Sequence, residues 1–426
     1  MYETLSAPML VNWEVTQFCN HNCLHCYNHW RTEIIKEKYP KNYKQIYENV
    51  TKELIRNKVF TVTITGGEPL AVFEKIIPFI KELSDARIWV VLNSNLTLLT
   101  SKRAKKLKEA GIRSILVSLP SADQKTCDKI TGIKNSLRSI TKGIRIAQKM
   151  NFPIFINMVV SKINNSQVKK TAEFVSLMGI THFSATKASD PSSKKEFNQY
   201  ILNHDEFRKM QQDLEEIKND YDLKINSLEA NPVCSYGNIK PSQGYKFCNA
   251  GKNVCTISPE GEIRPCNRII ESYGNIFDGL ENSWFKMEDW RSDKLIPDEC
   301  SDCKIKFICN GGCKADAVKA NGNLKKPDPL CDHQYILKEK QKSQLKLTIR
   351  KRFRINPKIK IRSEKFGAIL YSSLGNWLPV NHELLELFRK NLGKFISIEI
   401  IEKSLNVSKK DALLTATNLL QKNLLL

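Results

Sequence analysis

Short apolar runs alternate with longer amphipathic runs from Leu10 to about Ala188, and this alternation limits the possible folds more than any other feature. The short runs have the length and composition of buried β-strands, and the amphipathic runs have the spacing of helices that cover a core. Strands and helices that alternate in this way form βα units around a parallel sheet. The six predicted strands are Leu10–Thr16, Thr61–Thr65, Ile88–Leu92, Ser114–Leu119, Ile154–Val160 and His182–Thr186.

Six βα units are fewer than the eight of a closed barrel, so we predict an α/β fold with a partial (β/α)6 TIM barrel. In such barrels the chemistry gathers on the loops that follow the strands. Residues 189–230 are polar, with an amphipathic helix predicted over Asp205–Lys218, and we expect them to close the open side of the barrel. The helices predicted between the strands are Tyr43–Asn57, Phe73–Leu83, Ser101–Ala110, Leu137–Met150 and Gln167–Met178.

The composition is that of a globular protein large enough for two or three domains, with 426 residues, 41% hydrophobic and 26% charged. No apolar run is long enough to span a membrane, and Met1–Thr4 does not begin a secretory signal, so we expect no membrane partner. Thirteen cysteines in such a chain favour metal binding or catalysis over disulfides. We therefore expect a protein of the reducing cytoplasm.

Three cysteines, Cys19, Cys23 and Cys26, follow the first predicted strand with the spacing C-x3-C-x2-C. Thiolates are the usual ligands of iron–sulfur clusters. Three thiolates on a four-iron cluster leave one iron open, and that iron can bind a group other than protein. Zinc and a disulfide framework are the alternatives, but zinc usually takes four ligands in paired C-x2-C units and disulfides need an oxidising compartment.

Small residues follow the next three predicted strands. Thr65-Gly66-Gly67-Glu68-Pro69 comes after the second, and its two glycines permit close backbone approach to a ligand, although a GG pair by itself usually marks a turn. Ser94 and Ser118 stand at the ends of the third and fourth strands. Loop capping is the simplest role for these two serines when the sequence is taken alone.

The three-cysteine motif, followed one strand later by Gly66-Gly67-Glu68-Pro69, resembles the motifs of radical S-adenosylmethionine (SAM) enzymes. The segment from Thr131-Gly132-Ile133 through Ile154–Val160 also resembles this family, although Thr131 stands where an arginine is usual. The resemblance implies that the open iron of a 4Fe–4S cluster binds SAM, which one electron cleaves to methionine and a hydrogen-abstracting 5′-deoxyadenosyl radical. It also implies a set of residues at or near SAM, namely Gly66, Gly67, Glu68, Pro69, Ser94, Ser118, His25 and Tyr27.

A second group of eight cysteines lies between Tyr245 and Asp332, around a hairpin predicted at Ser258–Glu262. Two four-thiolate sites would use all eight, and Cys127 and Cys234 would remain as small apolar fillers. Two zinc ribbons with sequential pairing are the alternative to iron. The eight cysteines are Cys248, Cys255, Cys266, Cys300, Cys303, Cys309, Cys313 and Cys331.

This spacing resembles the SPASM extension of radical SAM enzymes, which carries two auxiliary 4Fe–4S clusters with interleaved ligands. The resemblance implies full cysteine ligation, and hence electron transfer or pocket shaping rather than binding of substrate to iron. The implied first set is Cys248, Cys255, Cys266 and Cys313, and the second set is Cys300, Cys303, Cys309 and Cys331.

The last fifth of the chain is strongly basic. Residues 338–426 hold 19 Lys and Arg against seven Asp and Glu, so they carry +12 of the chain's net charge of +22. Such charge favours an acidic partner, either nucleic acid, a membrane surface or a peptide, although a lysine-rich solvated surface is the simpler interpretation. A linking helix is predicted first, at Lys338–Arg354.

Strands followed by helices predict a small winged-helix-like module in the rest of this segment. Arg362–Tyr371, with Asn381 before a leucine-rich helix, resembles the PqqD-like domain, which binds the leader of a precursor peptide as an added strand. The C-terminal position departs from many relatives of that domain. The predicted elements are strands Lys358–Arg362 and Phe366–Tyr371, a turn at Leu374–Asn376, and helices His382–Lys390, Ile398–Leu405 and Lys409–Asn423.

These features together predict a radical SAM barrel with bridging helices at residues 8–230, a SPASM domain at 231–337, and a basic linker with a PqqD-like domain at 338–426. The implied function is modification, by cross-linking, of a ribosomally made precursor peptide, with electrons from a low-potential donor such as ferredoxin or flavodoxin. An anaerobic sulfatase-maturing enzyme is one alternative. A basic nucleic-acid-binding protein with structural metal sites is another, but it would not explain Gly66–Pro69 beside a three-cysteine site.

Overall fold

The computed structural model describes residues 4–28, 39–191, 195–241, 244–332, 352–372 and 376–426. The chain divides into two compact units. We call residues 7–337 the barrel unit, and residues 338–426 together with residues 3–6 the C-terminal unit. The domain boundary predicted near residue 230 therefore lies inside one compact unit, whereas the one predicted at residue 338 coincides with the start of the other.

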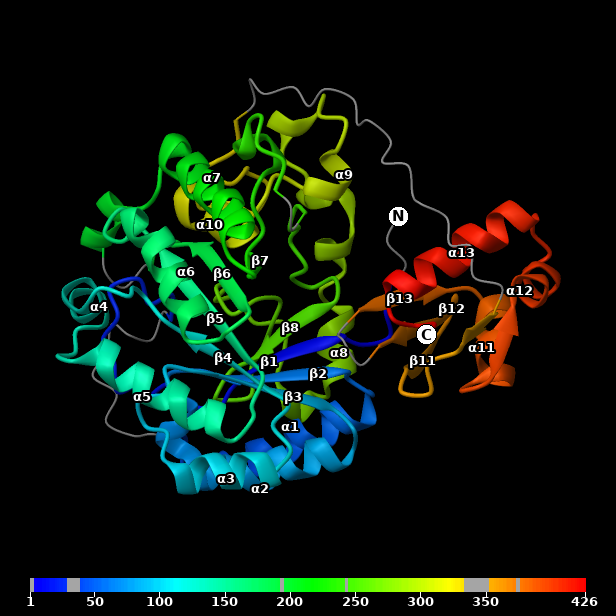
Figure 1. The fold of residues 1–426 in the computed structure, drawn as a ribbon, viewed down its shortest axis with the longest axis horizontal. Helices are drawn as coiled ribbons and strands as arrows, with labels where there is room; N and C mark the ends of the chain where they lie inside the picture. Colours follow the sequence, from blue (N-terminus) through cyan, green and yellow to red (C-terminus); the bar gives the residue numbers. More distant parts are fainter. Residues whose placement is uncertain (1–3, 29–38, 192–194, 242–243, 333–351, 373–375) are drawn as a thin grey trace. The chain divides into compact units, whose positions relative to one another are not determined.

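A single curved sheet forms the centre of the barrel unit, with the strand order β7-β6-β5-β4-β3-β2-β1-β8-β9 (Figure 1). Every neighbouring pair is parallel except β8 and β9. All six strands predicted from the sequence are present, with ends displaced by at most two residues. They are β1 (Leu10–Glu14), β2 (Thr61–Thr65), β3 (Trp89–Ser94), β4 (Ser114–Ser118), β5 (Ile154–Val160) and β6 (His182–Lys187).

Helices pack on the outer face of this sheet, as Figure 1 shows for α1 to α6. Each buries one apolar stripe, for example Ile46, Val50 and Leu54 of α1, as the 3.6-residue period predicts. The unpredicted α4 is capped by Asp123 and ends where Gly132 takes a φ of +70°. The helices are α1 (Tyr43–Arg56), α2 (Phe73–Asp85), α3 (Ser101–Glu109), α4 (Gln124–Thr131), α5 (Ser136–Lys149), α6 (Val168–Leu177) and α7 (His204–Asp220).

Three strands that the sequence did not place in the barrel extend the sheet at both edges. After α7, β7 (Lys224–Asn226) pairs in parallel with β6, so residues 189–230 lengthen the sheet; that they close the open side of the barrel stays a prediction. On the other edge, β8 (Val254–Ile257) pairs in parallel with β1. Its hairpin partner β9 (Ile263–Arg264) confirms the hairpin predicted at Ser258–Glu262. The cysteine-rich segment thereby starts inside the barrel sheet.

The remainder of the barrel unit consists of short helices that carry or separate the cysteines. The α-helices are α8 (Leu280–Phe285), α9 (Lys306–Cys309) and α10 (Lys314–Asn321). Two 3-10 turns matter for the sites below, η2 (Pro69–Val72) and η5 (Val233–Tyr236). Within the described ranges, no helix combines the length and apolar character that crossing a membrane requires.

The C-terminal unit has its own apolar core, which includes Phe353, Leu370, Phe388, Ile401 and Leu419. Two small antiparallel sheets, β11-β12-β13 and β10-β14, pack with three helices around it. The bounds are β10 (Arg352–Arg354), β11 (Lys360–Glu364), β12 (Gly367–Tyr371), β13 (Trp377–Val380), α11 (His382–Asn391), β14 (Phe395–Ser397), α12 (Ile398–Leu405) and α13 (Lys409–Gln421).

Two details of this unit differ from the sequence prediction. The prediction of a linking helix at Lys338–Arg354 is wrong at its end, because Arg352–Arg354 form strand β10, which buries Phe353 and leaves the two arginines exposed. Residues 338–351 of the predicted helix lie outside the described residues. Part of the predicted turn at Leu374–Asn376 lies outside them as well. The helix predictions are confirmed, and Asn381 caps α11 by accepting a hydrogen bond from Leu384 N–H at 3.1 Å.

Candidate active site and metal centres

The loop after β1 carries Cys19, Cys23 and Cys26, all half-buried, at the carboxyl edge of the parallel sheet. The loop turns tightly, because Cys26 N–H donates to the Cys23 carbonyl at 3.3 Å. His21 N–H points at the Cys19 sulfur at 3.4 Å. Three thiols on one short loop, none in a disulfide, fit a four-iron cluster that keeps one open iron.

The Gly66-Gly67 loop packs backbone to backbone against this cysteine loop. Gly67 N–H donates to the Thr16 carbonyl at 2.6 Å, and Glu68 N–H donates to the Phe18 carbonyl at 2.7 Å. A Cβ on Gly66 would lie 2.5 Å from the Thr16 oxygen, and one on Gly67 would lie 2.1 Å from the Phe18 oxygen. The two glycines are therefore required by the contact between the loops, whatever they do for a ligand.

The end of α4 supports the cysteine loop from another side. Asn22 N–H donates to the Thr131 carbonyl at 2.9 Å, and Leu24 N–H donates to the Ile130 carbonyl at 2.8 Å. The Thr131 hydroxyl donates back to the Cys127 carbonyl at 2.9 Å within the helix. Thr131 thus helps to hold the cysteine loop through its backbone carbonyl.

Glu68 is buried, and its carboxylate accepts three hydrogen bonds. They come from the Ser94 hydroxyl at 2.6 Å, Asn95 N–H at 2.9 Å and Leu70 N–H at 2.9 Å. Burial raises the pKa of Glu68, while these donors lower it. The side chains of Glu68 and Ser94 are therefore occupied with each other, and Pro69 begins η2 beside them. A contact of Glu68 with SAM stays a prediction and would run through its backbone.

Polar side chains line the carboxyl ends of β4, β5 and β6. Ser118 ends β4 and is in register with Asn157 of β5. The Thr186 hydroxyl of β6 donates to Asn157 Oδ1 at 2.8 Å. Sequence reasoning named Ser118 but missed the other two, although a polar residue within the apolar run Ile154–Val160 was a usable signal. This row can offer hydrogen bonds to a polar ligand above the sheet.

Two buried polar contacts join the cysteine loop and β1 to the segment around β9. The Tyr27 hydroxyl hydrogen bonds with Asn267, and burial raises its pKa. Glu14, the last residue of β1, forms an ion pair with Arg264 of β9, with side chains 0% and 1% exposed. His25 lies half-buried between Cys23 and Cys26. The first cysteine loop and the segment that carries Cys266 are therefore neighbours.

Cysteines of the predicted first auxiliary set gather around Arg268. Its guanidinium donates to the Cys313 sulfur at 3.1 Å, and its backbone N–H donates to the Cys266 sulfur at 3.5 Å. Cys248 interacts electrostatically with both of these cysteines. Cys255 is fully buried within β8, and among the described residues its thiol forms no hydrogen bond with the other three cysteines.

The predicted second set is less uniform. Cys300 and Cys309 are buried, Cys331 is half-buried, and Cys303 is exposed. The Cys300 thiol hydrogen bonds with the Cys331 thiol. Cys234, which the sequence suggested as an apolar filler, has its sulfur 3.4 Å from the Cys331 sulfur, so that interpretation does not fit its position. Cys127 does fit it, because the thiol is fully buried in α4.

Comparison with known proteins decides what the barrel is. Residues 13–175 match the family model described as the radical SAM superfamily. The barrel is a radical SAM domain. The protein is accordingly a radical SAM enzyme, with SAM and a 4Fe–4S cluster as cofactors.

Curated relatives of this radical SAM enzyme have different activities in their names. The AdoMet-dependent heme synthase of Methanosarcina barkeri is 27% identical over 355 residues, which are 78% of this chain and 98% of that protein. The PqqA peptide cyclase of Bradyrhizobium diazoefficiens is 23% identical over 365 residues, 80% of this chain and 91% of that protein.

Solved structures show the same fold. Streptococcus suis SuiB bound to S-adenosylmethionine matches with a TM-score of 0.64 and 20% identity, over 77% of this chain and 78% of SuiB. SuiB bound to its precursor peptide SuiA matches with a TM-score of 0.63 and 19% identity, over 76% of each chain. The partial barrel predicted from the strand pattern is confirmed.

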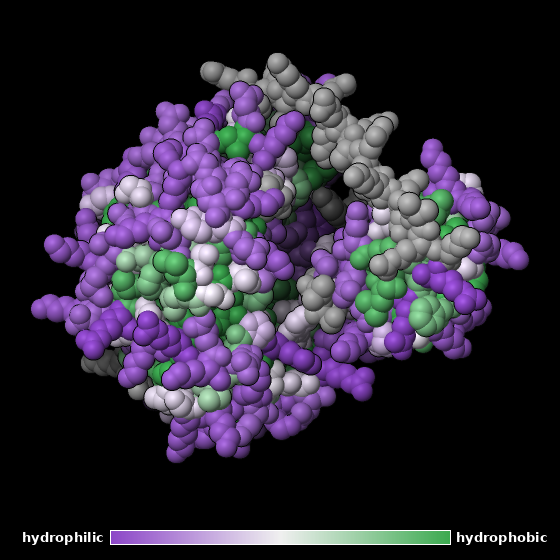
Figure 2. All heavy atoms as spheres, in the orientation of Figure 1, coloured by the Kyte–Doolittle hydropathy of each residue, from purple (hydrophilic) through white to green (hydrophobic). Residues whose placement is uncertain are grey.

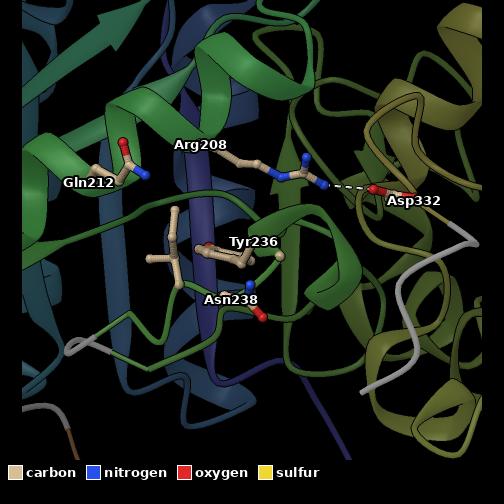
Figure 3. Close-up of a pocket in the computed structure, with 7 residues that line it drawn as sticks. Arg208, Gln212, Tyr236, Asn238 and Asp332 are labelled. Carbon is tan, nitrogen blue, oxygen red and sulfur yellow. Dashed lines mark hydrogen bonds and ion pairs between the residues drawn. The ribbon is translucent and has the colours of Figure 1, made fainter. Parts of the chain in front are cut away.

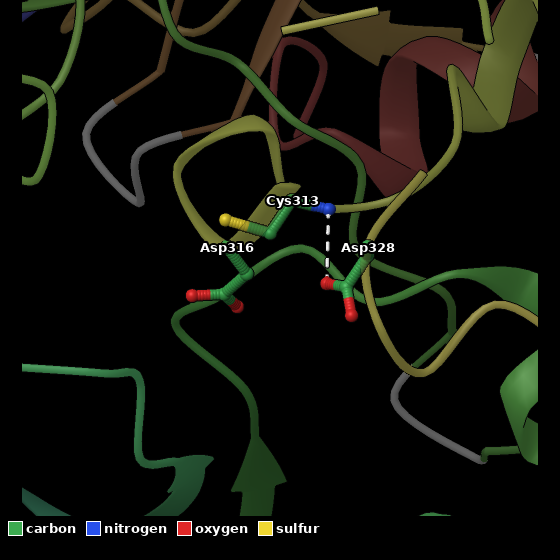
Figure 4. Close-up of side chains that lie close together, drawn as sticks. All are labelled: Cys313, Asp316 and Asp328. Carbon is green, nitrogen blue, oxygen red and sulfur yellow. Dashed lines mark hydrogen bonds between the residues drawn. The ribbon is translucent and has the colours of Figure 1, made fainter. Parts of the chain in front are cut away.

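A buried group of charges lies beside the first auxiliary set of this radical SAM enzyme. Lys187, the last residue of β6, pairs with Asp316 and, at 3.0 Å, with Asp328. Cys313 N–H donates to the Asp328 carboxylate at 3.2 Å (Figure 4). Burial lowers the pKa of Lys187, but the two carboxylates raise it above its ordinary value. Arg268 pairs with Asp316 at 3.1 Å and with Glu229 at 3.3 Å, so two cations and three carboxylates meet in this cluster.

These charges line one side of a cavity of about 360 Å³ at the carboxyl end of β6. Lys187, Ser189, Asp190 and Lys319 contribute its polar wall, and Ile201 and Leu202 contribute its apolar wall. No local pattern in the sequence marks Lys187 or Arg268, since each acquires its role from partners far along the chain. The cavity offers a polar space next to the carboxyl edge of the barrel sheet.

Proposed function

We propose that this radical SAM enzyme modifies a ribosomally made precursor peptide, whose leader docks on the C-terminal unit. The observation that carries this proposal is the combination of a three-thiol loop on a radical SAM barrel with a separate small unit that presents an open sheet edge. Relatives that include a peptide cyclase, and the fold shared with a protein solved with its precursor peptide, support it.

The edge strand β13 is the proposed docking site for the leader. In the sheet β11-β12-β13, the two edges are β11 and β13. On the β11 side, Ser6 N–H donates to the side-chain carboxylate of Glu364 at 2.8 Å. On the other side, Trp377 and Pro379 of β13 are exposed. Apolar side chains also reach the surface of this unit in Figure 2. An extended leader could add a strand at β13 and place alternate side chains against such apolar surface.

The basic charge of the C-terminal unit suits an acidic leader. Charges of one sign steer an oppositely charged partner at long range, and salt screens them. Arg362 does not contribute, because it is 3% exposed and paired with Glu364 at 2.7 Å. The other basic residues of this unit supply the proposed attraction.

The residues of the barrel divide the proposed chemistry among them. Cys19, Cys23 and Cys26 would hold the 4Fe–4S cluster. When bound, the cluster supplies the electron that cleaves SAM to methionine and a 5′-deoxyadenosyl radical. The loop at Gly66 and Gly67 would seat SAM beside the cysteines, and the polar row on β4–β6 would orient it. The protein otherwise excludes water and positions one C–H bond of the peptide.

Two auxiliary clusters would serve the oxidation that follows. Abstraction of a hydrogen atom leaves a carbon radical on the peptide, and closing a cross-link from it removes one further electron and one proton. We propose that clusters on the two cysteine sets of the SPASM segment accept this electron. A low-potential donor such as ferredoxin or flavodoxin would supply the electron that cleaves SAM.

Heme-type tetrapyrrole chemistry is the second candidate, because the heme synthase relative matches over 98% of its own length. The match uses 78% of this chain, so about a fifth of the chain has no counterpart in that relative. A basic unit with an open sheet edge is better explained by a peptide partner. The same unit argues against the sulfatase-maturing alternative.

The deciding experiment compares two substrates with one reconstituted enzyme. The protein, loaded anaerobically with iron and sulfide, is incubated with SAM, a reductant and either a precursor peptide encoded beside its gene or a tetrapyrrole. We expect the peptide to lose two hydrogen atoms per cross-link, and only while its leader is attached. A Cys19/Cys23/Cys26→Ala variant should form no 5′-deoxyadenosine. Conversion of the tetrapyrrole with no change in the peptide would overturn the proposal.

A further inference from the structure

Five cysteines lie at the predicted second auxiliary site, one more than a four-thiolate site uses. Four of them follow the spacing that predicted the site. The fifth, Cys234, comes from η5, earlier in the chain by 97 positions than Cys331. No pattern in the sequence predicts that Cys234 lies there. The five are Cys234, Cys300, Cys303, Cys309 and Cys331.

Cys234 points into this group of thiols. Its sulfur lies 3.4 Å from the Cys331 sulfur, and Asp332 N–H donates to it at 3.2 Å. The backbone N–H of Val233, the preceding residue, donates to the Cys309 thiol. Hydrogen bonds therefore connect Cys234 or its neighbour to two cysteines of the set, and one of these, Cys331, also contacts the Cys300 thiol.

Arg208 of α7 fastens the two segments that bring Cys234 and Cys331 together. Its Nε donates to the Ser235 carbonyl at 3.2 Å, and its Nη2 donates to the Asp332 carboxylate at 2.6 Å (Figure 3). Arg208, Tyr236 and Asp332 line a cavity of about 400 Å³ beside them. A bidentate guanidinium between a carbonyl and a carboxylate fixes orientation as well as distance. The hydrogen bonds of Arg208 therefore hold the Cys234 and Cys331 segments together within the barrel unit.

Cys303 has the opposite surroundings. It is exposed, while Cys300 and Cys309 on either side of it in the sequence are buried. Its backbone makes an ordinary turn, in which Cys303 N–H donates to the Cys300 carbonyl at 2.9 Å and its own carbonyl accepts from Lys306 N–H at 3.1 Å. No hydrogen bond given for the described residues involves the Cys303 thiol.

We propose that Cys234 is a metal ligand of the second auxiliary site and completes it with Cys300, Cys309 and Cys331, in place of Cys303. This inference rests on the proposed function, which assigns a cluster to that site. It changes the ligand set implied by the sequence spacing. Soft thiolate ligands from both η5 and the C-x2-C-x5-C segment would then hold the cluster between two parts of the barrel unit.

Metal analysis of full-length variants tests the ligand set. Wild type, Cys234→Ala, Cys303→Ala, Cys300→Ala and Cys127→Ala are loaded anaerobically, and iron, sulfide and EPR spectra are measured per chain. We expect Cys234→Ala and Cys300→Ala to lose about a third of the wild-type iron, which is one of three four-iron clusters. Cys303→Ala and the buried control Cys127→Ala should keep it all. Cleavage of SAM should survive in each, because the N-terminal site is untouched.

Thiol labelling of the unmutated enzyme provides a readout that does not depend on the folding of a variant. Under anaerobic conditions an alkylating reagent should modify Cys303 but not Cys234, as read by peptide mass spectrometry. After removal of iron with a chelator, Cys234 should become reactive.

Several results would overturn the inference. They are loss of iron in Cys303→Ala, full iron in Cys234→Ala, protection of Cys303 with labelling of Cys234, and a disulfide between Cys234 and Cys331. Each of them leaves the proposed function standing if wild type holds three clusters. Wild type with the iron of a single cluster would instead refute the auxiliary clusters, and this inference with them.

Discussion

At the scale of single residues, the motif after β2 is built to hold the cysteine loop. Gly67 leaves no room for a Cβ, since the Phe18 carbonyl oxygen would lie 2.1 Å away. Glu68 organises the ends of β2 and β3 by accepting from Ser94, Asn95 and Leu70. Both residues were predicted as contacts of SAM, and the structure gives each a prior task in loop geometry.

Gly67→Ala should displace the cysteine loop. The added methyl group would meet backbone rather than a flexible side chain, so one of the two loops must move. We expect loss of about a third of the bound iron and of SAM cleavage, measured by metal analysis and 5′-deoxyadenosine formation. Gly179→Ala is the control, because its Cβ has open space and only a positive φ of 73° opposes it. Equal iron in both variants would contradict the packing argument.

Glu68→Gln should lower stability and weaken SAM binding. The amide keeps the shape of the side chain but loses the charge that strengthens three hydrogen bonds, and its NH₂ group faces a donor. Leaving one buried donor unsatisfied costs about 1–3 kcal/mol. Thermal unfolding and SAM titration measure the two effects. Glu74→Gln, on an exposed carboxylate of α2, should change stability by under about 0.5 kcal/mol. A Glu68→Gln variant as stable as Glu74→Gln would refute the role.

At the scale of elements, β8 and β9 join the cysteine-rich segment to the barrel sheet. The pairing of β8 with β1 places Cys255 opposite Val11. The ion pair of Glu14 with Arg264 connects the end of β1 to β9. Both partners of that pair are almost fully buried, so each depends on the other. The same sheet thereby connects the loop that carries Cys19, Cys23 and Cys26 with the segment that carries Cys255 and Cys266.

Glu14→Gln should be strongly destabilising because it leaves the Arg264 guanidinium buried without its counter-charge. Breaking one side of such a pair costs about 3–5 kcal/mol. The double variant Glu14→Leu/Arg264→Met should recover much of this loss, as seen in the unfolding temperature. Lys81→Met, which breaks the exposed pair with Asp85, should cost about 0–1 kcal/mol. A single variant no worse than this control would show that the pair does not hold the strands.

At the scale of the whole molecule, the proposed chemistry and the proposed recognition of the peptide belong to separate compact units. The barrel unit carries all thirteen cysteines, and the C-terminal unit carries a basic surface and an open β-edge. This division predicts that peptide affinity can be changed without touching the radical chemistry.

Trp377→Ala should weaken binding of the precursor peptide about tenfold, which is about 1.4 kcal/mol, because an aromatic anchor on β13 is removed. Cleavage of SAM without peptide should be unchanged. Phe395→Ala, which removes an aromatic residue 66% exposed on β14, is the matched control and should bind normally. Fluorescence anisotropy with a labelled leader measures both. Equal affinity of the two variants would move the docking site away from β13.

The sequence by itself determined the features that depend on local spacing. The six barrel strands, most of their helices, the three-thiol loop and the three helices of the C-terminal unit follow from periodicity and from residues a few positions apart. These elements formed where predicted, because hydrophobic period and chelating spacing act within one segment. Gly66 and Gly67 were predicted to contact a ligand, which stays a prediction; the structure shows that they also leave room for a neighbouring loop.

The tertiary structure alone decided which distant segments meet. Glu14 and Arg264 are 250 positions apart, Lys187 and Asp316 are 129, and Cys234 and Cys331 are 97. No local pattern marks these pairs, since each is made by a strand added to the sheet edge or by a side chain such as Arg208 that clamps two loops. Buried charges and thiols acquire their roles from partners, and the partners are chosen by the packing of the whole barrel unit.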